Sequence, residues 1–143
     1  MPKSTSTCNS FLALIYNATA WANIADNASS SPITTISMAL STVTGAVADT
    51  MSTNEATYTN YLRVTVARTT GGWTAPASRA TSNAAQITFA QCGASGNTIT
   101  SAKTGVAAGA SVVLHYGDLN APITVSNLIQ PVFAIGAVTI TEA

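Results

Sequence analysis

The chain has 143 residues, of which 47% are hydrophobic and only 7% are charged, and its formal net charge is +0. A neutral chain with no basic stripe lacks the cations that neutralise phosphates, which excludes ordinary electrostatic binding to nucleic acid. Soluble domains carry about 25% charged residues, so this surface must be built largely from hydroxyl, amide and small apolar groups. Such a composition favours a subunit that packs against copies of itself or a scaffold, where charges would be costly to desolvate.

The length corresponds to one domain, residues 1–143, with enough chain for a hydrophobic core. Cys8 and Cys92 are the two cysteines, too few for a disulfide framework. We interpret them as reduced, small apolar residues, although the sequence leaves their pairing open. No segment approaches the roughly 20 apolar residues of a membrane span, and the run 11–16 is too short for a signal-peptide core. The chain is therefore expected to be made in a cytoplasm and to have no membrane partner.

The first predicted element is a helix over residues 4–16, within an N-terminal arm of residues 1–17. Ser4 and its two neighbours can cap the helix, and Asn17 is a suitable stop because asparagine tolerates the left-handed conformation. The apolar stripe of the helix consists of Phe11, Leu12, Leu14 and Ile15. After the helix, we expect a short strand over residues 18–24, with Trp21 as an anchor, and then a loop over residues 26–32.

Alternation of apolar and polar residues predicts the central strands. Ile36, Met38 and Leu40 alternate with polar or small residues in a strand over 34–41. Residues 41–57 lack such a pattern and predict a long loop, of a length that is usually functional or mobile. The clearest strand signal lies in 58–73, where Leu62, Val64 and Val66 alternate with Arg63, Thr65 and Ala67, before the Gly71-Gly72 turn and Trp73.

The remaining segments predict further short strands and turns. In chain order they are a turn at 75–78, a strand at 86–90, a turn at 93–97, a weak strand at 98–103, a strand at 111–116 closed by Gly117-Asp118, and strands at 122–125, 132–133 and 137–141. Seven or eight short strands separated by turn residues indicate an all-β domain, arranged as a β-sandwich or jelly roll with a short N-terminal helix.

The polar residues give no pattern typical of catalysis or of a cofactor site. His115 is the only histidine, which rules out any site with two histidine ligands, and its simplest role is on a sheet face. His115, Asp118 and a serine could be combined into a triad on paper, but no nucleophile elbow is present. Asp49 and Glu55 share one loop and are best interpreted as solvated loop residues. With no phosphate loop or Cys-x-x-Cys motif, we expect no catalytic, metal or cofactor residues and no enzymatic activity.

The aromatic residues near the central strand allow two interpretations. Tyr58, Tyr61 and Trp73 could form a platform on which sugar rings stack. Packing in the core or at an interface explains them at least as well, because aromatic side chains dominate both.

Three motifs carry a resemblance that covers nearly the whole chain. They are Tyr58-x-x-Tyr61-x-Arg63, Ser82-Asn83-x-x-x-Ile87-Thr88-Phe89, and Gly136-Ala137-Val138-Thr139-Ile140-Thr141. With them the chain resembles the small virion structural proteins of tailed bacteriophages, which include head-decoration and tail-fibre-like proteins. The motifs belong to the fold rather than to catalysis. Residues 40–45 depart from the family's Leu-His-Thr-Ala-Asp-Pro-like turn, so no role is transferred to that turn.

The resemblance implies a capsid decoration, or cement, protein that is made in the host cytoplasm and resides on the capsid surface of the virion. Its partners would be the major capsid protein and copies of itself, with a trimer as the arrangement suggested by capsid symmetry axes, and it would reinforce the shell by multivalent packing. The residues expected at its interfaces are Phe11, Trp21, Tyr58, Tyr61, Arg63 and Trp73. The alternative is a tail-fibre or tail-tip module that binds a host receptor or carbohydrate, and the sequence leaves head and tail locations open.

Overall fold

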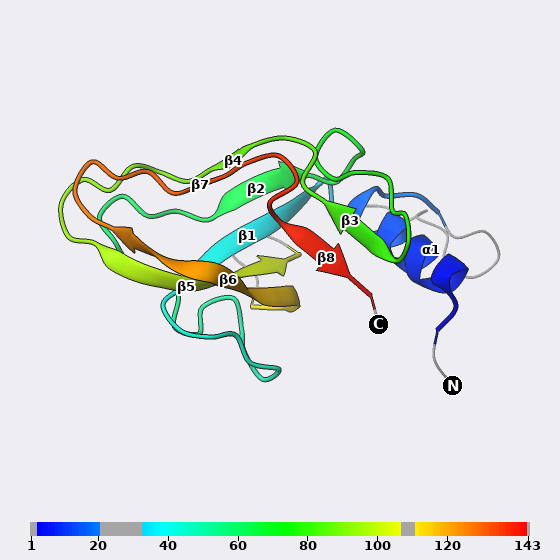
Figure 1. Cartoon of the computed structure of the whole chain (residues 1–143), viewed down its shortest axis with the longest axis horizontal. Helices are drawn as coiled ribbons and strands as arrows, with labels where there is room; N and C mark the ends of the chain where they lie inside the picture. Colours follow the sequence, from blue (N-terminus) through cyan, green and yellow to red (C-terminus); the bar gives the residue numbers. More distant parts are fainter. Residues whose placement is uncertain (1–2, 21–32, 107–110, 143) are drawn as a thin grey trace. The chain divides into compact units, whose positions relative to one another are not determined.

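The computed structural model describes residues 3–20, 33–106 and 111–142, and strands dominate this part of the chain (Figure 1). Its elements are α1 (Thr5–Tyr16), β1 (Thr35–Ser41), β2 (Val64–Ala67), β3 (Ala80–Ser82), β4 (Ile87–Thr88), β5 (Asn97–Gly105), β6 (Val113–Val125), β7 (Val132–Phe133) and β8 (Thr139–Thr141). β2, β1, β5 and β6 form a four-stranded sheet in that order, while β3 pairs with β8 and β4 with β7. This confirms the predicted all-β class with a short N-terminal helix.

The chain forms two compact units, each assembled from separate segments. Unit 1 comprises Met1–Thr35, Val66–Ile87 and Phe133–Ala143, and unit 2 comprises Ile36–Thr65 and Thr88–Val132. The chain therefore passes between the units four times, and each passage lies inside a strand, namely β1, β2, β4 or β7.

Helix α1 begins where the sequence predicts, because Ser4 caps it. The Ser4 hydroxyl accepts a hydrogen bond from the backbone N–H of Thr7 at 3.2 Å, which satisfies one of the free donors of the first turn. The helix ends at Asn17, as predicted, but the left-handed residue is Ala18, with φ of 53°. Cys8, Leu12 and Tyr16 form its buried face, whereas Phe11 is 39% exposed.

Unit 1 is organised by buried polar groups as well as apolar ones. The Tyr16 and Trp73 rings pack edge to face with centroids 4.8 Å apart. The Arg68 guanidinium donates to the carbonyls of Leu14 and Ile15 in the last turn of α1. Because helix ends leave their last carbonyls without intrahelical donors, Arg68 acts as a C-terminal cap supplied by a distant part of the chain.

Unit 2 is built around β1 and β5, which pair antiparallel from Ser37↔Gly105 to Ser41↔Ser101. β1 was predicted to bury only Ile36, Met38 and Leu40, but six of its seven residues are buried. The alternation was real, yet both faces of the strand are covered, so small residues fill the second face.

Four segments differ from the sequence prediction, and two of them are β5 and β6. β5, predicted as a weak strand, is nine residues long and lies between β1 and β6. β6 does not end at Gly117-Asp118 but runs for thirteen residues, with a register shift where Ser101↔Asp118 changes to Ile99↔Ile123. The extra β6 residues form a bulge that contains Pro122, a residue that sheets accept at bulges and edges because it has no N–H.

The segment before β2 was predicted as strand and is not. Leu62, expected on the buried face, is 72% exposed, and the strand begins only at Val64. Asn60 has a φ of 76°, which interrupts an extended backbone. Residues 18–20, predicted to begin a strand, are also not in one, and the rest of that strand, with Trp21 and the loop at 26–32, lies outside the described residues.

Candidate functional site

Two of the predicted site residues, Tyr61 and Arg63, converge on Glu55 in unit 2. The Arg63 guanidinium donates two hydrogen bonds of 2.7 Å each to the Glu55 carboxylate, from Nε to Oε1 and from Nη2 to Oε2. Arg63 Nη2 also donates to the Ser52 hydroxyl at 2.9 Å. A two-point contact of this kind fixes both side chains and neutralises their charges. Glu55 lies at the end of the long loop. Its backbone forms a β-bridge with Ser41 of β1, which fixes this end of the loop against the strand.

The Tyr61 hydroxyl connects this ion pair to the sheet. It donates to Glu55 Oε1 and accepts a hydrogen bond from the backbone N–H of Leu40, both at 3.0 Å. Burial raises the pKa of Tyr61 well above its usual value, and the Glu55 carboxylate raises it further, so the group is a neutral donor. The hydrogen bond to Glu55 likewise raises the pKa of Arg63.

A shallow depression of about 570 Å³ lies over this cluster. It is lined by Ser52, Glu55, Ala56, Thr57, Tyr61, Leu62 and Arg63. The carboxylate and guanidinium satisfy each other, which leaves hydroxyls, backbone groups and the exposed Leu62 side chain for an outside partner. Such a lining suits contact with a neutral polar surface.

The aromatic platform considered for these residues is not on the surface. Tyr58 is 2% exposed and packs edge to face against Tyr61 at 5.2 Å, while its hydroxyl donates to the Ala90 carbonyl. Burial raises the pKa of Tyr58 to about 12. Tyr61 also stacks with Phe89 at 6.2 Å between ring centroids. Tyr58 and Phe89 thus belong to the core of unit 2, and the half-buried Tyr61 packs on both of them while it lines the depression.

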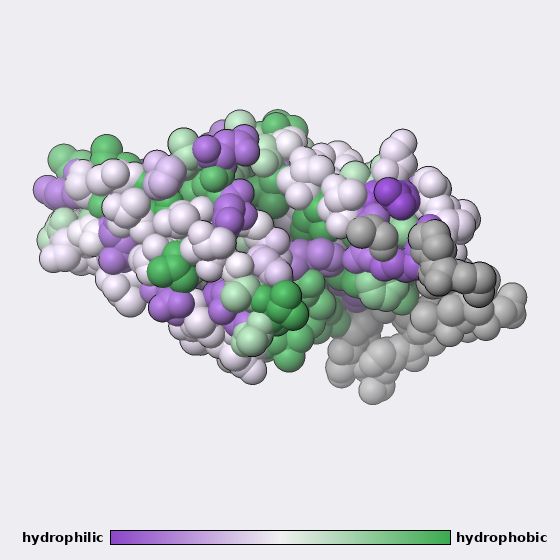
Figure 2. All heavy atoms as spheres, turned by 60° about the horizontal axis from the view of Figure 1, so that its bottom comes forward, coloured by the Kyte–Doolittle hydropathy of each residue, from purple (hydrophilic) through white to green (hydrophobic). Residues whose placement is uncertain are grey.

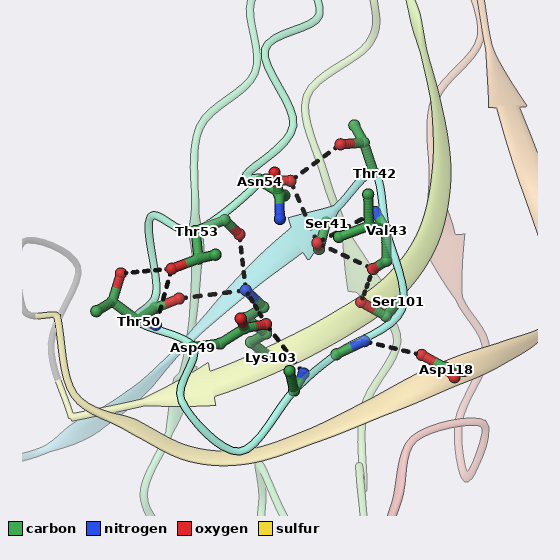
Figure 3. A network of polar contacts seen from close by, with 12 residues as sticks. Ser41, Thr42, Val43, Asp49, Thr50, Thr53, Asn54, Ser101, Lys103 and Asp118 are labelled. Atoms are coloured by element: carbon green, nitrogen blue, oxygen red, sulfur yellow. Dashed lines mark hydrogen bonds and ion pairs between the residues drawn. The ribbon is translucent and has the colours of Figure 1, made fainter.

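A second polar network fixes the loop between β1 and Glu55 (Figure 3). Its centre is Lys103 of β5, whose side chain is 1% exposed. The Lys103 ammonium contacts Asp49 Oδ2 at 2.9 Å and donates to the carbonyls of Thr53 and Thr50 at 2.7 and 3.2 Å. The hydrogen bond from Lys103 lowers the pKa of Asp49, and the backbone N–H of Ala46 lowers it further. One buried lysine thus provides three of the polar contacts that hold the loop over the sheet.

The same loop is tied to the sheet at its other side. Ser101 Oγ donates to the Val43 carbonyl at 2.7 Å, and the Gly45 N–H donates to Asp118 Oδ1 at 3.1 Å (Figure 3). Between these contacts and Asp49, residues 46–48 remain exposed, and Val47 is 91% exposed. The long loop therefore presents a short apolar tip, defined here as residues 45–48, on a fixed base.

The remaining predicted interface residues do not join this site. Phe11 lies on α1 in unit 1 and is 39% exposed, whereas Trp73 is fully buried in the same unit. Trp21 lies outside the described residues. An interface role stays a prediction for Phe11, Tyr61 and Arg63. The side chains of Tyr58 and Trp73 are buried within the chain, so a partner could not contact them in this structure.

Sequence reasoning missed the residues that organise the site, Lys103 and Glu55. Asp49 and Glu55 were interpreted as solvated, yet both carry an ion pair. The available signal was the phase of β5: Lys103 shares a strand face with Ile99 and Ser101, and both of those residues are buried. A lysine on a buried face requires an acidic partner, but no local signal in the sequence identifies Asp49 as that partner, because a returning loop makes the contact.

The part of the chain that the structure describes also bears on metal binding and on membrane insertion. Within it, no three His, Cys, Asp or Glu side chains are grouped as a metal site would require, and no helix is long and apolar enough to cross a membrane. Cys8 and Cys92 are both free and buried, as the interpretation of them as small apolar residues predicted.

Comparison with known proteins places the chain in a family. No curated protein matches it. A family model described as podophage GP4 fiber I protein gp80 matches residues 13–141, which is most of the chain and includes all three motifs of the phage resemblance. The chain therefore belongs to the gp80 family of podophage fibre proteins and is a structural protein of the phage virion.

Proposed function

We propose that this chain is a subunit of a fibre on a tailed-phage particle and that it acts by packing and surface contact rather than by catalysis. The observation that carries the proposal is the family match over residues 13–141. It favours the fibre alternative over the capsid decoration role that the resemblance implied.

The polar side chains of unit 2 support a structural role. Arg63 and Glu55 neutralise each other, and Lys103 is enclosed by its three acceptors. A catalytic group must instead be available to a reacting atom and hold a proton state suited to transfer. The Tyr61 hydroxyl, with its raised pKa, is a fixed donor rather than a base.

Contact with the host surface would use the depression over the Glu55–Arg63 pair. The Ser52 and Thr57 hydroxyls and the exposed Leu62 side chain at its rim suit a neutral ligand such as a surface polysaccharide better than a charged one. The test compares binding of the isolated chain to host-cell polysaccharide before and after Leu62→Asp. Ile135→Asp, at a side chain 69% exposed in unit 1, is the matched control.

Locating the chain in the particle tests the fibre assignment. Cryo-electron microscopy combined with antibody labelling should place it in a fibre. Density repeated over the capsid lattice would support the decoration role and overturn the fibre proposal. Absence of the chain from purified particles would overturn both.

A further inference from the structure

The turn between β6 and β7 holds a leucine in a backbone conformation that leucine disfavours. The Ile129 N–H donates to the Ser126 carbonyl at 2.9 Å, which closes a four-residue turn, and its third residue, Leu128, has a φ of 68°. That position of such a turn prefers glycine or asparagine, because a bulky side chain is crowded in the left-handed region. The Leu128 side chain is 68% exposed, so packing within its own chain does not account for the strain.

A second turn of unit 2 has the ordinary residue at the same position. The Tyr61 N–H donates to the Tyr58 carbonyl at 2.8 Å, and the third residue of this turn, Asn60, has a φ of 76°. Asparagine tolerates the left-handed conformation at little cost. Of these two turns, only the one with Leu128 combines a positive φ with an exposed apolar side chain.

The chain between β4 and β5 holds the two turns on either side of it. Asn60 Nδ2 donates to the Gln91 carbonyl at 3.4 Å, and Gln91 Nε2 donates to the Leu128 carbonyl at 2.9 Å. The Leu128 N–H also donates to the Cys92 carbonyl at 2.8 Å, and Figure 1 shows the chain between β4 and β5 beside the chain between β6 and β7. Leu62, at the rim of the depression, is only two residues from Asn60. The depression and the Leu128 turn therefore lie at the same end of unit 2.

The surface between the two leucines offers hydrogen-bond acceptors. Asn60 and Gln91 are exposed, and their amide nitrogens make the contacts just described, so within the described residues their side-chain oxygens accept no hydrogen bond. The charged residues of the adjoining depression, Glu55 and Arg63, neutralise each other.

This surface suits a chain of neutral sugars, whose C–H groups pack on aliphatic side chains and whose hydroxyls donate hydrogen bonds. Strongly hydrophilic residues are scattered rather than clustered on the face in Figure 2, so no charged patch there points to a charged ligand.

We propose that Leu128 is a second contact point for the polysaccharide that binds the depression. One sugar chain extends from Leu62 at the rim, over the two exposed amide side chains, to Leu128. This inference rests on the proposed function. The strain at Leu128 is then offset by binding, because glycine or asparagine would suit the turn better but would offer the ligand less apolar surface.

Changes at residue 128 should move stability and binding in opposite directions. Leu128→Gly and Leu128→Asn relieve the backbone strain, so thermal denaturation of each full-length variant should show a midpoint about 3 °C higher than that of the natural chain. Each variant should bind purified surface polysaccharide of the host about tenfold more weakly, because a contact with one leucine is lost.

Two controls separate the strain from the contact. Leu128→Met keeps both the strain and an apolar side chain, so it should unfold and bind like the natural chain. Ser78→Gly relieves a positive φ of 50° at an exposed residue of unit 1, so it should raise the midpoint and leave binding unchanged.

Two results would overturn the second contact. One is Leu128→Gly binding the polysaccharide as tightly as the natural chain does. The other is a lower midpoint for both Leu128→Gly and Leu128→Asn, which would show that the leucine serves the fold. The proposed function fails by a different result: if the natural chain binds no host polysaccharide, both proposals fall. A chain whose binding weakens with Leu62→Asp but not with Leu128→Gly would keep the site at the depression and lose the second contact.

Discussion

Lys103 is the residue on which the geometry of unit 2 most depends. Its ammonium is buried, and all three of its contacts belong to the loop that covers β5. Removing one partner of a buried ion pair costs more than the pair contributes, because the other polar groups lose their partner without regaining water.

Lys103→Met tests this dependence while keeping a side chain of similar length. We expect the free energy of unfolding, measured by urea denaturation, to fall by about 3 kcal/mol, since Asp49 and two carbonyls lose their donor. Lys3→Met is the control, because Lys3 forms its ion pair with Glu142 on the surface. If the free energy of unfolding fell equally in the two variants, the buried ion pair of Lys103 would contribute no more to stability than the surface pair of Lys3.

Asp49 makes stability depend on acidity. Its pKa in the folded chain is lowered, first by the hydrogen bond from Lys103, so the fold favours the carboxylate. The resulting stabilisation is present above the ordinary aspartate pKa of about 4 and is lost as the pH falls through the lower folded value. Urea denaturation from neutral to acid pH should give a steeper loss for the natural chain than for Asp49→Asn. If the free energy of unfolding fell equally with pH in the two proteins, Asp49 would not be the source of the acid sensitivity.

Tyr61→Phe isolates the hydroxyl that joins the Glu55–Arg63 pair to β1. The Leu40 N–H would lose its acceptor, so we expect a loss of about 1–2 kcal/mol in the free energy of unfolding. Tyr116→Phe removes a hydroxyl from a half-exposed ring and should change stability little. If the two variants matched, the hydroxyl bridge would contribute nothing measurable.

The sequence identified Tyr61 and Arg63 as a pair worth testing but not the carboxylate between them. Their spacing was visible, whereas Glu55 reaches them only because the loop end bridges to Ser41. Contacts within a few residues can be predicted from the pattern. Contacts made by a returning loop depend on the fold and have no local signal.

Among the elements, α1 and the Gly-Gly turn were predictable because their determinants are local. The Ser4 cap and the Asn17 stop lie in the helix sequence itself. β5 was underestimated because its residues, Asn-Thr-Ile-Thr-Ser-Ala-Lys-Thr-Gly, look like those of an exposed strand. Its central place comes from pairing with β1 and β6, which are distant in sequence. The segment before β2 is the opposite case. Its residues alternate as in a strand, but Asn60 has a positive φ, which an extended backbone does not adopt.

The two glycines of the turn before Trp73 should respond differently to alanine. A Cβ at Gly72 would overlap the Ala67 carbonyl, whereas at Gly71 the nearest atom is Thr69 Oγ1 at 3.6 Å. Gly72→Ala should therefore lower the free energy of unfolding by more than about 2 kcal/mol, and Gly71→Ala should change it by less than about 1 kcal/mol. Thermal denaturation of both variants checks the contrast. A tolerated Gly72→Ala would mean that the turn can shift away from Ala67.

At the scale of the whole molecule, the division into two units sets how the chain should unfold. Neither unit is a continuous stretch, and the four passages between them lie inside strands. Loss of either unit would remove residues from strands of the other.

We therefore expect one cooperative unfolding transition, as the single-domain prediction implies. In a Trp21→Phe background, Trp73 fluorescence would report unit 1, and hydrogen exchange of the β5 amides would report unit 2. Both probes should give the same free energy of unfolding. Separate values would define two domains in place of one.

Unit 1 also joins the two ends of the described chain. Lys3 forms an ion pair with Glu142, Asn9 of α1 accepts a hydrogen bond from the Arg79 N–H, and β3 pairs with β8. A mechanical force applied at residues 3 and 142 would pass through these contacts and pull β8 away from β3. All of these contacts belong to unit 1, and none of them involves a residue of unit 2. Tension applied at these two residues would thus strain the contacts of unit 1 first.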